Sequence, residues 1–129
     1  MGFLSKKSML VSLLALSLAA CASTRTIQPT NTVELACDGD AGSHDVAKTI
    51  TFKMKAGSAC DLQEVDFTHD PHSNYTHFKK HPPATGANPP VVFDYTESSP
   101  PLGDGAYFYY VTKSTNSPNP DGGGGGIIK

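Results

Sequence analysis

The chain has 129 residues, with 10 Lys and Arg against 12 Asp and Glu, which leaves a formal net charge of −2. A chain of this length accommodates one small domain. Because the basic residues form neither a cluster nor a cationic amphipathic helix, the composition argues against nucleic-acid binding and against direct attachment to a membrane through the protein surface.

Residues 1–20 have the three-part layout of a secretory signal. A positively charged pair, Lys6 and Lys7, precedes an apolar run over residues 9–18, and two alanines then lead into Cys21. We expect an N-terminal signal helix here. The apolar run is shorter than the ~20 residues that a bilayer-spanning helix needs, so a permanent membrane span is not expected.

The segment Leu18-Ala19-Ala20-Cys21 resembles the lipobox of bacterial lipoprotein precursors, in which small residues precede an obligatory cysteine. The resemblance implies that a diacylglyceryl group is attached to the Cys21 thiol, that the chain is cleaved before Cys21, and that the new N-terminus is acylated, with palmitate as the expected fatty acid. It also implies a protein held in the cell envelope by its lipid. Because Ala22 rather than Asp follows the cysteine, a Gram-negative host would deliver it to the outer membrane, facing the periplasm. The alternative is an ordinary cleaved signal followed by an incidental cysteine.

Three regions follow from this interpretation. Residues 1–20 are the signal peptide, residues 21–31 are the lipidated cysteine and a flexible polar tether, and residues 32–129 form a single β-rich domain with a Gly-rich C-terminal segment. As a flexible coil, the tether would hold the domain roughly 15–20 Å from the anchor.

Two further cysteines, Cys37 and Cys60, form an even pair in an oxidising compartment, so we expect a disulfide between them. Closing that loop contributes on the order of 3 kcal/mol in the chain-entropy model. A free or metal-bound pair is the alternative. The sequence has no Cys-x-x-Cys spacing, which leaves a thioredoxin-like redox role without support.

Apolar and polar residues alternate in several short segments that are separated by Gly- and Pro-rich turns. The expected strands cover residues 32–37, 49–55, 65–67, 91–96, 107–111 and 127–128. The aromatic run at 107–111 predicts a central strand contacted on both faces. The glycines at 122–126 indicate a flexible tail or a slack loop that returns Ile127 and Ile128 to a sheet edge. The pattern favours an all-β fold, a small antiparallel β-sandwich with an immunoglobulin-like or cupredoxin-like outline.

Four histidines, His69, His72, His77 and His81, lie close together in the sequence and are candidate ligands for zinc or copper. A turn at Asp70-Pro71 would bring His69 and His72 together, with a third ligand such as His44 from elsewhere. His77 and His81 fit worse, because an extended segment separates them by about 13 Å. The cupredoxin copper site is absent, since no Cys, His or Met follows His81. The alternative is a solvated loop with incidental histidines.

Tyr107 and Tyr109 form a possible recognition surface if they face outward while Phe108 and Tyr110 face inward. The alternative is that these aromatic residues mainly fill the core. No convergent catalytic set is apparent: the side chains of the consecutive residues Ser43-His44-Asp45 point apart. The sequence therefore predicts no enzyme and no cofactor, but an envelope-anchored lipoprotein with a non-catalytic binding or structural domain. Its partner would be an envelope protein or polymer. The alternative function is a periplasmic metal-binding protein that uses the His-rich loop.

Overall fold

The computed structural model describes residues 26–69, 77–84, 86–98, 101–103 and 105–129. The predicted signal helix, the anchor residue Cys21 and the candidate ligand His72 lie outside the described residues.

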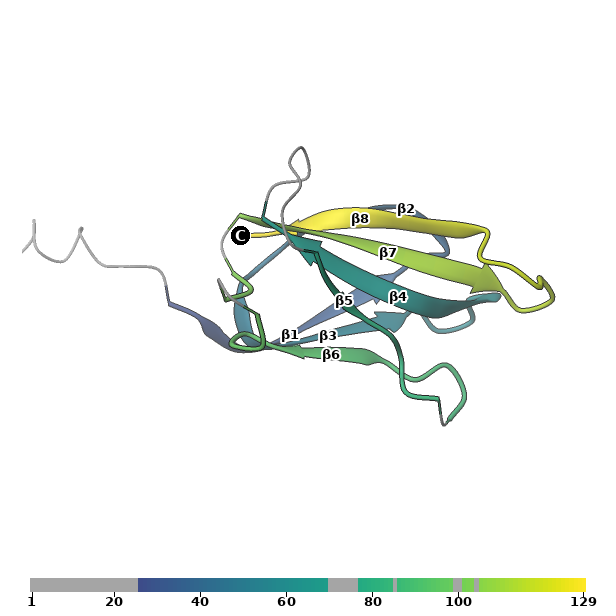
Figure 1. Cartoon of the computed structure of the whole chain (residues 1–129), viewed down its shortest axis with the longest axis horizontal. Coiled ribbons are helices and arrows are strands. Elements are labelled where there is room, and N and C mark those ends of the chain that lie inside the picture. Colours follow the sequence, from purple (N-terminus) through teal and green to yellow (C-terminus); the bar gives the residue numbers. More distant parts are fainter. Residues whose placement is uncertain (1–25, 70–76, 85, 99–100, 104) are drawn as a thin grey trace, which may run out of the picture.

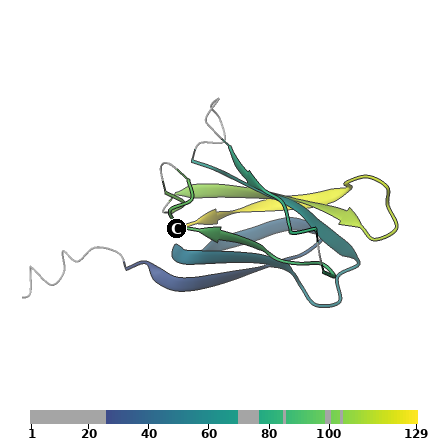
Figure 2. The same cartoon turned by 60° about the horizontal axis from the view of Figure 1, so that its bottom comes forward.

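The described residues form eight strands and no helix, arranged as two packed sheets (Figures 1 and 2). The three-stranded sheet has the order β1-β3-β6 and the five-stranded sheet the order β2-β8-β7-β4-β5. The predicted all-β sandwich is confirmed. The strands are β1 (Gln28–Leu35), β2 (Asp38–His44), β3 (Ala47–Met54), β4 (Cys60–Thr68), β5 (Phe78–Lys80), β6 (Val91–Asp94), β7 (Ala106–Ser114) and β8 (Gly122–Ile128).

Both sheets bury the apolar positions that alternate along their strands. In β3, Ile50, Phe52 and Met54 are buried, and the residues between them are exposed or half-buried. Successive side chains of a strand point to opposite faces, so period-two alternation places all three residues in the layer between the sheets. Phe52 lies at the centre of this layer and contacts aromatic rings from both sheets. Its ring centroid is 4.9 Å from that of Phe108, 5.6 Å from Phe67 and 5.8 Å from Phe93.

The sheets are mixed rather than purely antiparallel. Four pairings are antiparallel, but β1 pairs with β3 in parallel, and β2 pairs with β8 in parallel. The chain leaves the first sheet after β1, forms β2 in the other sheet and returns as β3. Because of this crossover, β1 and β3 run in the same direction, which a sequence pattern of alternating residues does not reveal.

The predicted disulfide is confirmed: Cys37 and Cys60 are bonded, with their Cα atoms 5.9 Å apart. Cys37 lies between β1 and β2, and Cys60 is the first residue of β4. The bond therefore joins the crossover between the two sheets to a strand of the five-stranded sheet.

The glycine run at 122–126 is neither a tail nor a slack loop; it belongs to β8, which lies between β2 and β7 (Figure 1). Sequence pattern missed this strand because glycine has a low intrinsic β-propensity. The glycines of β8 have no side chains of their own, but the neighbouring strand β7 carries large ones. Phe108, Tyr109 and Tyr110 pair directly with Gly126, Gly125 and Gly124. A Cβ atom at Gly126 would lie 2.5 Å from Cζ of Phe108, and one at Gly124 would collide with the carbonyl oxygen of Gly39. Aromatic rings and backbone carbonyl oxygens of the neighbouring strands thus occupy the space that side chains of β8 would need.

Two smaller expectations also differ from the structure. β1 begins at Gln28 rather than at residue 32, because the pairing with β3 extends over the polar residues that the sequence assigned to the tether. β7 is central in its sheet, as expected, but it is not covered on both faces. Phe108 and Tyr110 are buried, whereas Tyr109 is 42% exposed.

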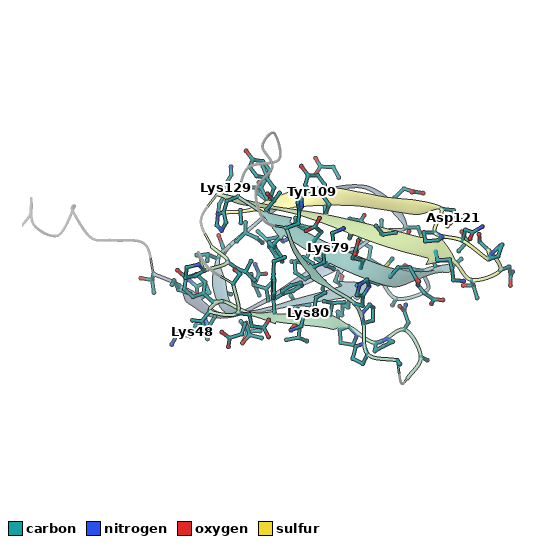
Figure 3. The ribbon with its side chains drawn as sticks, in the orientation of Figure 1. Lys48, Lys79, Lys80, Tyr109, Asp121 and Lys129 are labelled. Carbon is teal, nitrogen blue, oxygen red and sulfur yellow. A yellow bond between two sulfur atoms is a disulfide. The ribbon has the colours of Figure 1, made fainter. Side chains whose placement is uncertain are left out.

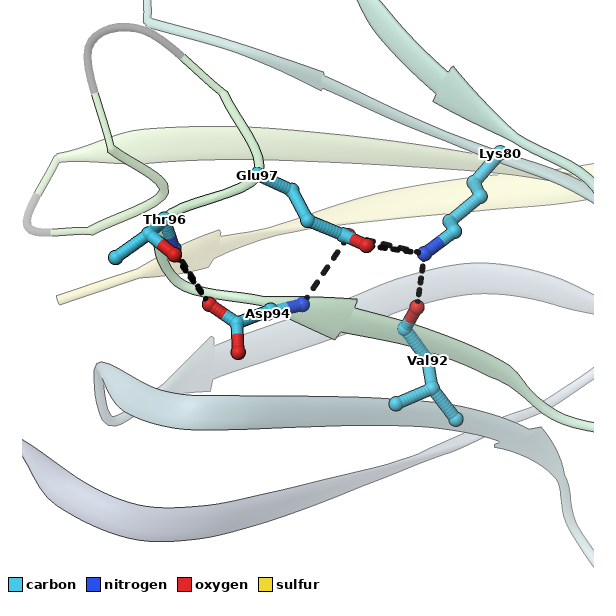
Figure 4. A network of polar contacts seen from close by, with 5 residues as sticks. All are labelled: Lys80, Val92, Asp94, Thr96 and Glu97. Atoms are coloured by element: carbon cyan, nitrogen blue, oxygen red, sulfur yellow. Dashed lines mark hydrogen bonds and ion pairs between the residues drawn. The ribbon is translucent and has the colours of Figure 1, made fainter.

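Lys80 on β5 links the two sheets across one open side of the sandwich (Figure 4). Its Nζ donates to the carbonyl oxygen of Val92 at 2.7 Å and to both carboxylate oxygens of Glu97 at 2.9 Å. It also lies 5.3 Å from the centroid of the Phe93 ring, a favourable position for a cation–π contact. These contacts tie β5 to β6 and to the turn that follows β6.

We expect Lys80→Met to lower the free energy of unfolding by about 1 kcal/mol. The variant keeps the apolar stem and removes the ion pair, which is partly screened by solvent, together with the cation–π contact. Urea denaturation of both proteins measures the difference. Lys53→Met is the matched control, because Lys53 forms an exposed pair with Glu34 at 3.7 Å and should contribute about 0.3 kcal/mol. Equal effects of the two substitutions would show that Lys80 is an ordinary surface lysine.

Candidate functional site: the outer face of the five-stranded sheet

The chemically richest surface among the described residues is the outer face of the five-stranded sheet, centred on Tyr109. Alternation along β7 turns Tyr107, Tyr109 and Val111 outward and buries Phe108 and Tyr110. Figure 3 shows Tyr109 and Lys79 on the layer formed by this sheet. We call this surface the Tyr109 face; its outward positions are Asp38, Asp40, Glu64, Asp66, Lys79, Tyr107, Tyr109, Val111, Gly123 and Gly125.

One row of this face crosses all five strands. In the register of the sheet, Asp40 pairs with Gly125, Gly125 with Tyr109, Tyr109 with Asp66, and Asp66 with Lys79. Cross-strand partners on one face have Cβ atoms about 5 Å apart, so neighbouring members of the row are within reach of one another. The row combines an aromatic ring with carboxylates and an amine.

Tyr109 lies against a neighbour that has no side chain. Its Cδ1 and Cε1 atoms are 3.0 and 3.3 Å from the position that a Cβ atom of Gly125 would occupy. The ring can therefore rest on the backbone of β8 while 42% of the residue stays exposed to solvent. A larger residue at position 125 would displace the ring.

Carboxylates of β4 face imidazoles at the two ends of β5. His77 Nδ1 and Asp66 Oδ2 are hydrogen-bonded at 2.9 Å, and His81 Nε2 lies 3.8 Å from a Glu64 carboxylate oxygen. The Nδ1 atom of His81 is also 3.0 Å from the carbonyl oxygen of Gln63. Each histidine thus has its own partner on β4, and the two do not form one group.

Asp66 is a largely buried carboxylate of this face. Its side chain is 14% exposed, and no hydrogen-bond donor in the described part of the chain reaches its buried Oδ1 atom. Burial raises the pKa of Asp66, while the charge and hydrogen bond of His77 and the charge of Lys79 act in the opposite direction. The neutral form of this carboxyl group is therefore favoured in the folded protein relative to the unfolded chain.

We expect Asp66→Asn to be at least as stable as the natural protein at neutral pH, with a gain of up to about 0.5 kcal/mol after allowance for solvent screening. A carboxyl group whose folded pKa is raised stabilises the fold below its unfolded pKa and loses that contribution as the pH rises through its folded pKa. The natural protein should therefore lose stability relative to the variant as the pH rises above the ordinary aspartate value of 3.8. Thermal unfolding of both proteins across this range measures the difference. A variant that is less stable at neutral pH would show that the His77 contact outweighs burial.

A shallow hollow of about 590 Å³ lies beside this face, between β4 and the segment that follows β5. Three prolines line it together with polar side chains, among them Gln63, His81 and Asn88. Asn88 has a positive φ of 51°, and its side-chain oxygen accepts a hydrogen bond from the backbone nitrogen of Leu62 at 3.4 Å, next to the bulge in β4. The contact joins the segment after β5 to β4 at an irregularity of the sheet.

The other candidate metal ligands are not gathered by the described structure. His69 is exposed directly after β4, and its predicted companion His72 lies outside the described residues. The Nε2 atom of His44, the suggested third ligand, is 2.6 Å from the carbonyl oxygen of Ala41. Within the described ranges there is no group of three or more His, Cys, Asp or Glu side chains that could hold a metal ion.

Comparisons with known proteins add no relative: no family model, no curated protein and no solved structure matches the chain. Among the described residues, no helix is long and apolar enough to cross a membrane. The class of protein defined by fold and site is thus a small disulfide-linked β-sandwich with a polar, aromatic outer face.

Proposed function

We propose that the protein is an envelope-anchored lipoprotein whose β-sandwich is a non-catalytic binding module, with the Tyr109 face as its binding surface. The observation that carries the proposal is the exposed ring of Tyr109 within a row of polar side chains that crosses the whole sheet. Exposed tyrosines are well suited to binding because they bring a large rigid surface and a hydroxyl group at a low cost in side-chain entropy.

The anchor supports the same proposal. Lipidation at Cys21 would tie the protein to a membrane, in a Gram-negative host the outer membrane on its periplasmic side. β1 begins at Gln28, and the chain from Cys21 to Gln28 spans at most about 24 Å. A sandwich held this close to its anchor would meet envelope proteins or polymers that lie near the membrane surface.

We expect Cys21→Ser to release the protein from the detergent-soluble membrane fraction, because the serine hydroxyl cannot take the thioether-linked lipid. Fractionation of cells that produce either form measures this. Retention of the variant in the membrane would contradict the lipid anchor. A pull-down from solubilised envelopes with the natural protein tests binding; recovery of no partner, together with turnover of a substrate, would contradict the non-catalytic module.

A second candidate function, metal binding, is favoured by one observation. Metal-binding histidines usually hydrogen-bond a carboxylate through the ring nitrogen that does not bind the metal, and the contact of His77 Nδ1 with Asp66 has this geometry. His77 Nε2 would then be one ligand, and His69 and His72 are the residues we propose for the others, with zinc or copper as the ion.

Calorimetric titration of the detergent-solubilised mature protein with zinc and with copper tests the second candidate. Tight one-to-one binding that is lost in His69→Ala/His72→Ala and in His77→Ala would support it. Weak binding that is unchanged in these variants would remove it.

A further inference from the structure

The ring of Tyr109 forms an exposed aromatic platform on the sheet face, because its neighbour on β8 has no side chain. Most outward side chains of a sheet stand roughly perpendicular to it, with large neighbours on both sides. Here the neighbour on β8 is Gly125, and two ring carbons lie within 3.3 Å of its missing Cβ position. The ring is thereby supported from one side by backbone and remains 42% exposed.

On the side of β2, two carboxylates border the Tyr109 ring. Asp40 pairs with Gly125 and Asp38 pairs with Gly123, so both carboxylates lie one strand beyond the glycines. β2 and β8 contain no lysine or arginine. On the other side of Tyr109, the charge of Asp66 is opposed by His77 and Lys79.

Both carboxylates of β2 are held in place and keep an oxygen for a ligand. Asp40 Oδ1 accepts a hydrogen bond from Gly42 N at 2.8 Å, and Asp38 Oδ1 accepts one from Gly123 N at 3.2 Å. Their negative charges also act on the buried hydroxyl group of Tyr110, which lies 3.3 Å from the carbonyl oxygen of Gly39 on β2: after burial, they are the causes that raise the pKa of Tyr110. A cation over the glycines would therefore meet a negative potential and the negative face of an aromatic ring.

The same geometry indicates which class of ligand fits the Tyr109 face. β8 and β7 are paired on both sides, so their backbones have no free edge to which an extended peptide could add as a strand. An anionic polymer would be repelled by Asp38 and Asp40. A pyranose ring suits the platform, because its C–H groups can stack on the flat tyrosine face while its amine and hydroxyl groups donate to the carboxylates.

We propose that the Tyr109 face binds a glycan containing amino sugars, with one pyranose ring stacked on Tyr109 and its amine or hydroxyl groups bonded to Asp40 and Asp38. The proposal deepens the proposed function and rests on it.

The probe is a glucosamine hexamer in mildly acidic buffer, where its amines are protonated, titrated by calorimetry into the detergent-solubilised mature protein. We expect saturable binding that Tyr109→Ala weakens by about tenfold, as expected for the loss of a cation–π and stacking contact. Tyr109→Phe keeps the ring and should keep most of the affinity. Asp40→Asn should weaken binding by about threefold and reduce its dependence on salt.

Two substitutions on the outer face of the other sheet are matched controls. Val92→Ala removes the other large apolar side chain that is exposed among the described residues, at 43%, and Glu34→Gln removes an exposed charge. Both should leave binding unchanged, and thermal unfolding of every variant checks that the fold is retained.

Two other oligomers, hexalysine and a galacturonate hexamer, distinguish amino-sugar binding from attraction by charge alone and from binding of an acidic glycan. Equal binding of hexalysine, unaffected by Tyr109→Ala, would show attraction by charge alone and overturn the proposal. Tighter binding of a galacturonate hexamer would overturn it as well. Absence of binding to all three probes would overturn the amino-sugar assignment, while an envelope partner captured in the pull-down would leave the binding module intact.

Discussion

Replacement of Phe52 by alanine is expected to lower the free energy of unfolding by about 4 kcal/mol, the typical cost of truncating a fully buried phenylalanine. Phe52 is 0% exposed and contacts Phe67, Phe93 and Phe108, so its removal leaves a cavity between the two sheets. The loss is large against the total of about 5–15 kcal/mol that stabilises a small domain. Guanidinium denaturation followed by tyrosine fluorescence measures it, since the chain contains no tryptophan.

Phe52→Leu should cost less than the alanine variant, because leucine fills part of the cavity. The exposed substitution Val92→Ala should change stability by about 0.5 kcal/mol or less. A loss below about 1 kcal/mol for Phe52→Ala would contradict the packing of the two sheets around this ring.

Removal of the disulfide by Cys37→Ser/Cys60→Ser is expected to cost about 3 kcal/mol. The two cysteines are 23 residues apart, and opening a loop of that size returns this amount of conformational entropy to the unfolded chain in the loop-closure model. For a domain of this size, the melting temperature should fall by about 15 °C. Calorimetric unfolding of both proteins measures the shift.

Reduction of the natural protein is the matched control for the double variant. Treatment with a thiol reductant should lower the melting temperature by about as much as the substitutions do. An unchanged melting temperature in both experiments would show that the bond contributes nothing to the stability of the fold.

Local pattern predicted the elements in which side-chain alternation coincides with burial. In β3 and β7 every second residue faces the core, and period two found both strands. The number of cysteines, together with the oxidising compartment expected from the signal, predicted the disulfide between Cys37 and Cys60. The two strands were predictable because alternation depends only on residues that are neighbours in the sequence. The disulfide was predictable because pairing two cysteines requires no knowledge of how the strands are aligned.

β2 and β8 could not be predicted in this way. Their sequences contain mostly small and polar residues, and the side chains of Phe108 and Tyr110 from β7 lie against Gly126 and Gly124 of β8. The hydroxyl group of Tyr110 reaches the carbonyl oxygen of Ala36 at 2.9 Å. The information that makes these segments strands thus resides in another strand, where a pattern search along the chain does not find it.

The candidate site was predicted only in part. Alternation offered the outward direction of Tyr109 as one of two alternatives, and it did not reveal the row that Tyr109 shares with Asp40 and Asp66. The signals for that row are Asp66 between two core residues of β4, and His77, Lys79 and His81 at period two. These residues can be placed in one row only when the register of β4 against β5 and β7 is known, and tertiary packing sets that register.

The most direct test of the account is photo-crosslinking in living cells that produce the full-length chain. A benzophenone amino acid is placed at position 109, in the proposed binding surface, or at position 92, on the outer face of the opposite sheet. We expect adducts with an envelope component from position 109 and few or none from position 92. Equal labelling from both positions, or none from position 109 while position 92 reacts, would contradict the Tyr109 face as the binding surface.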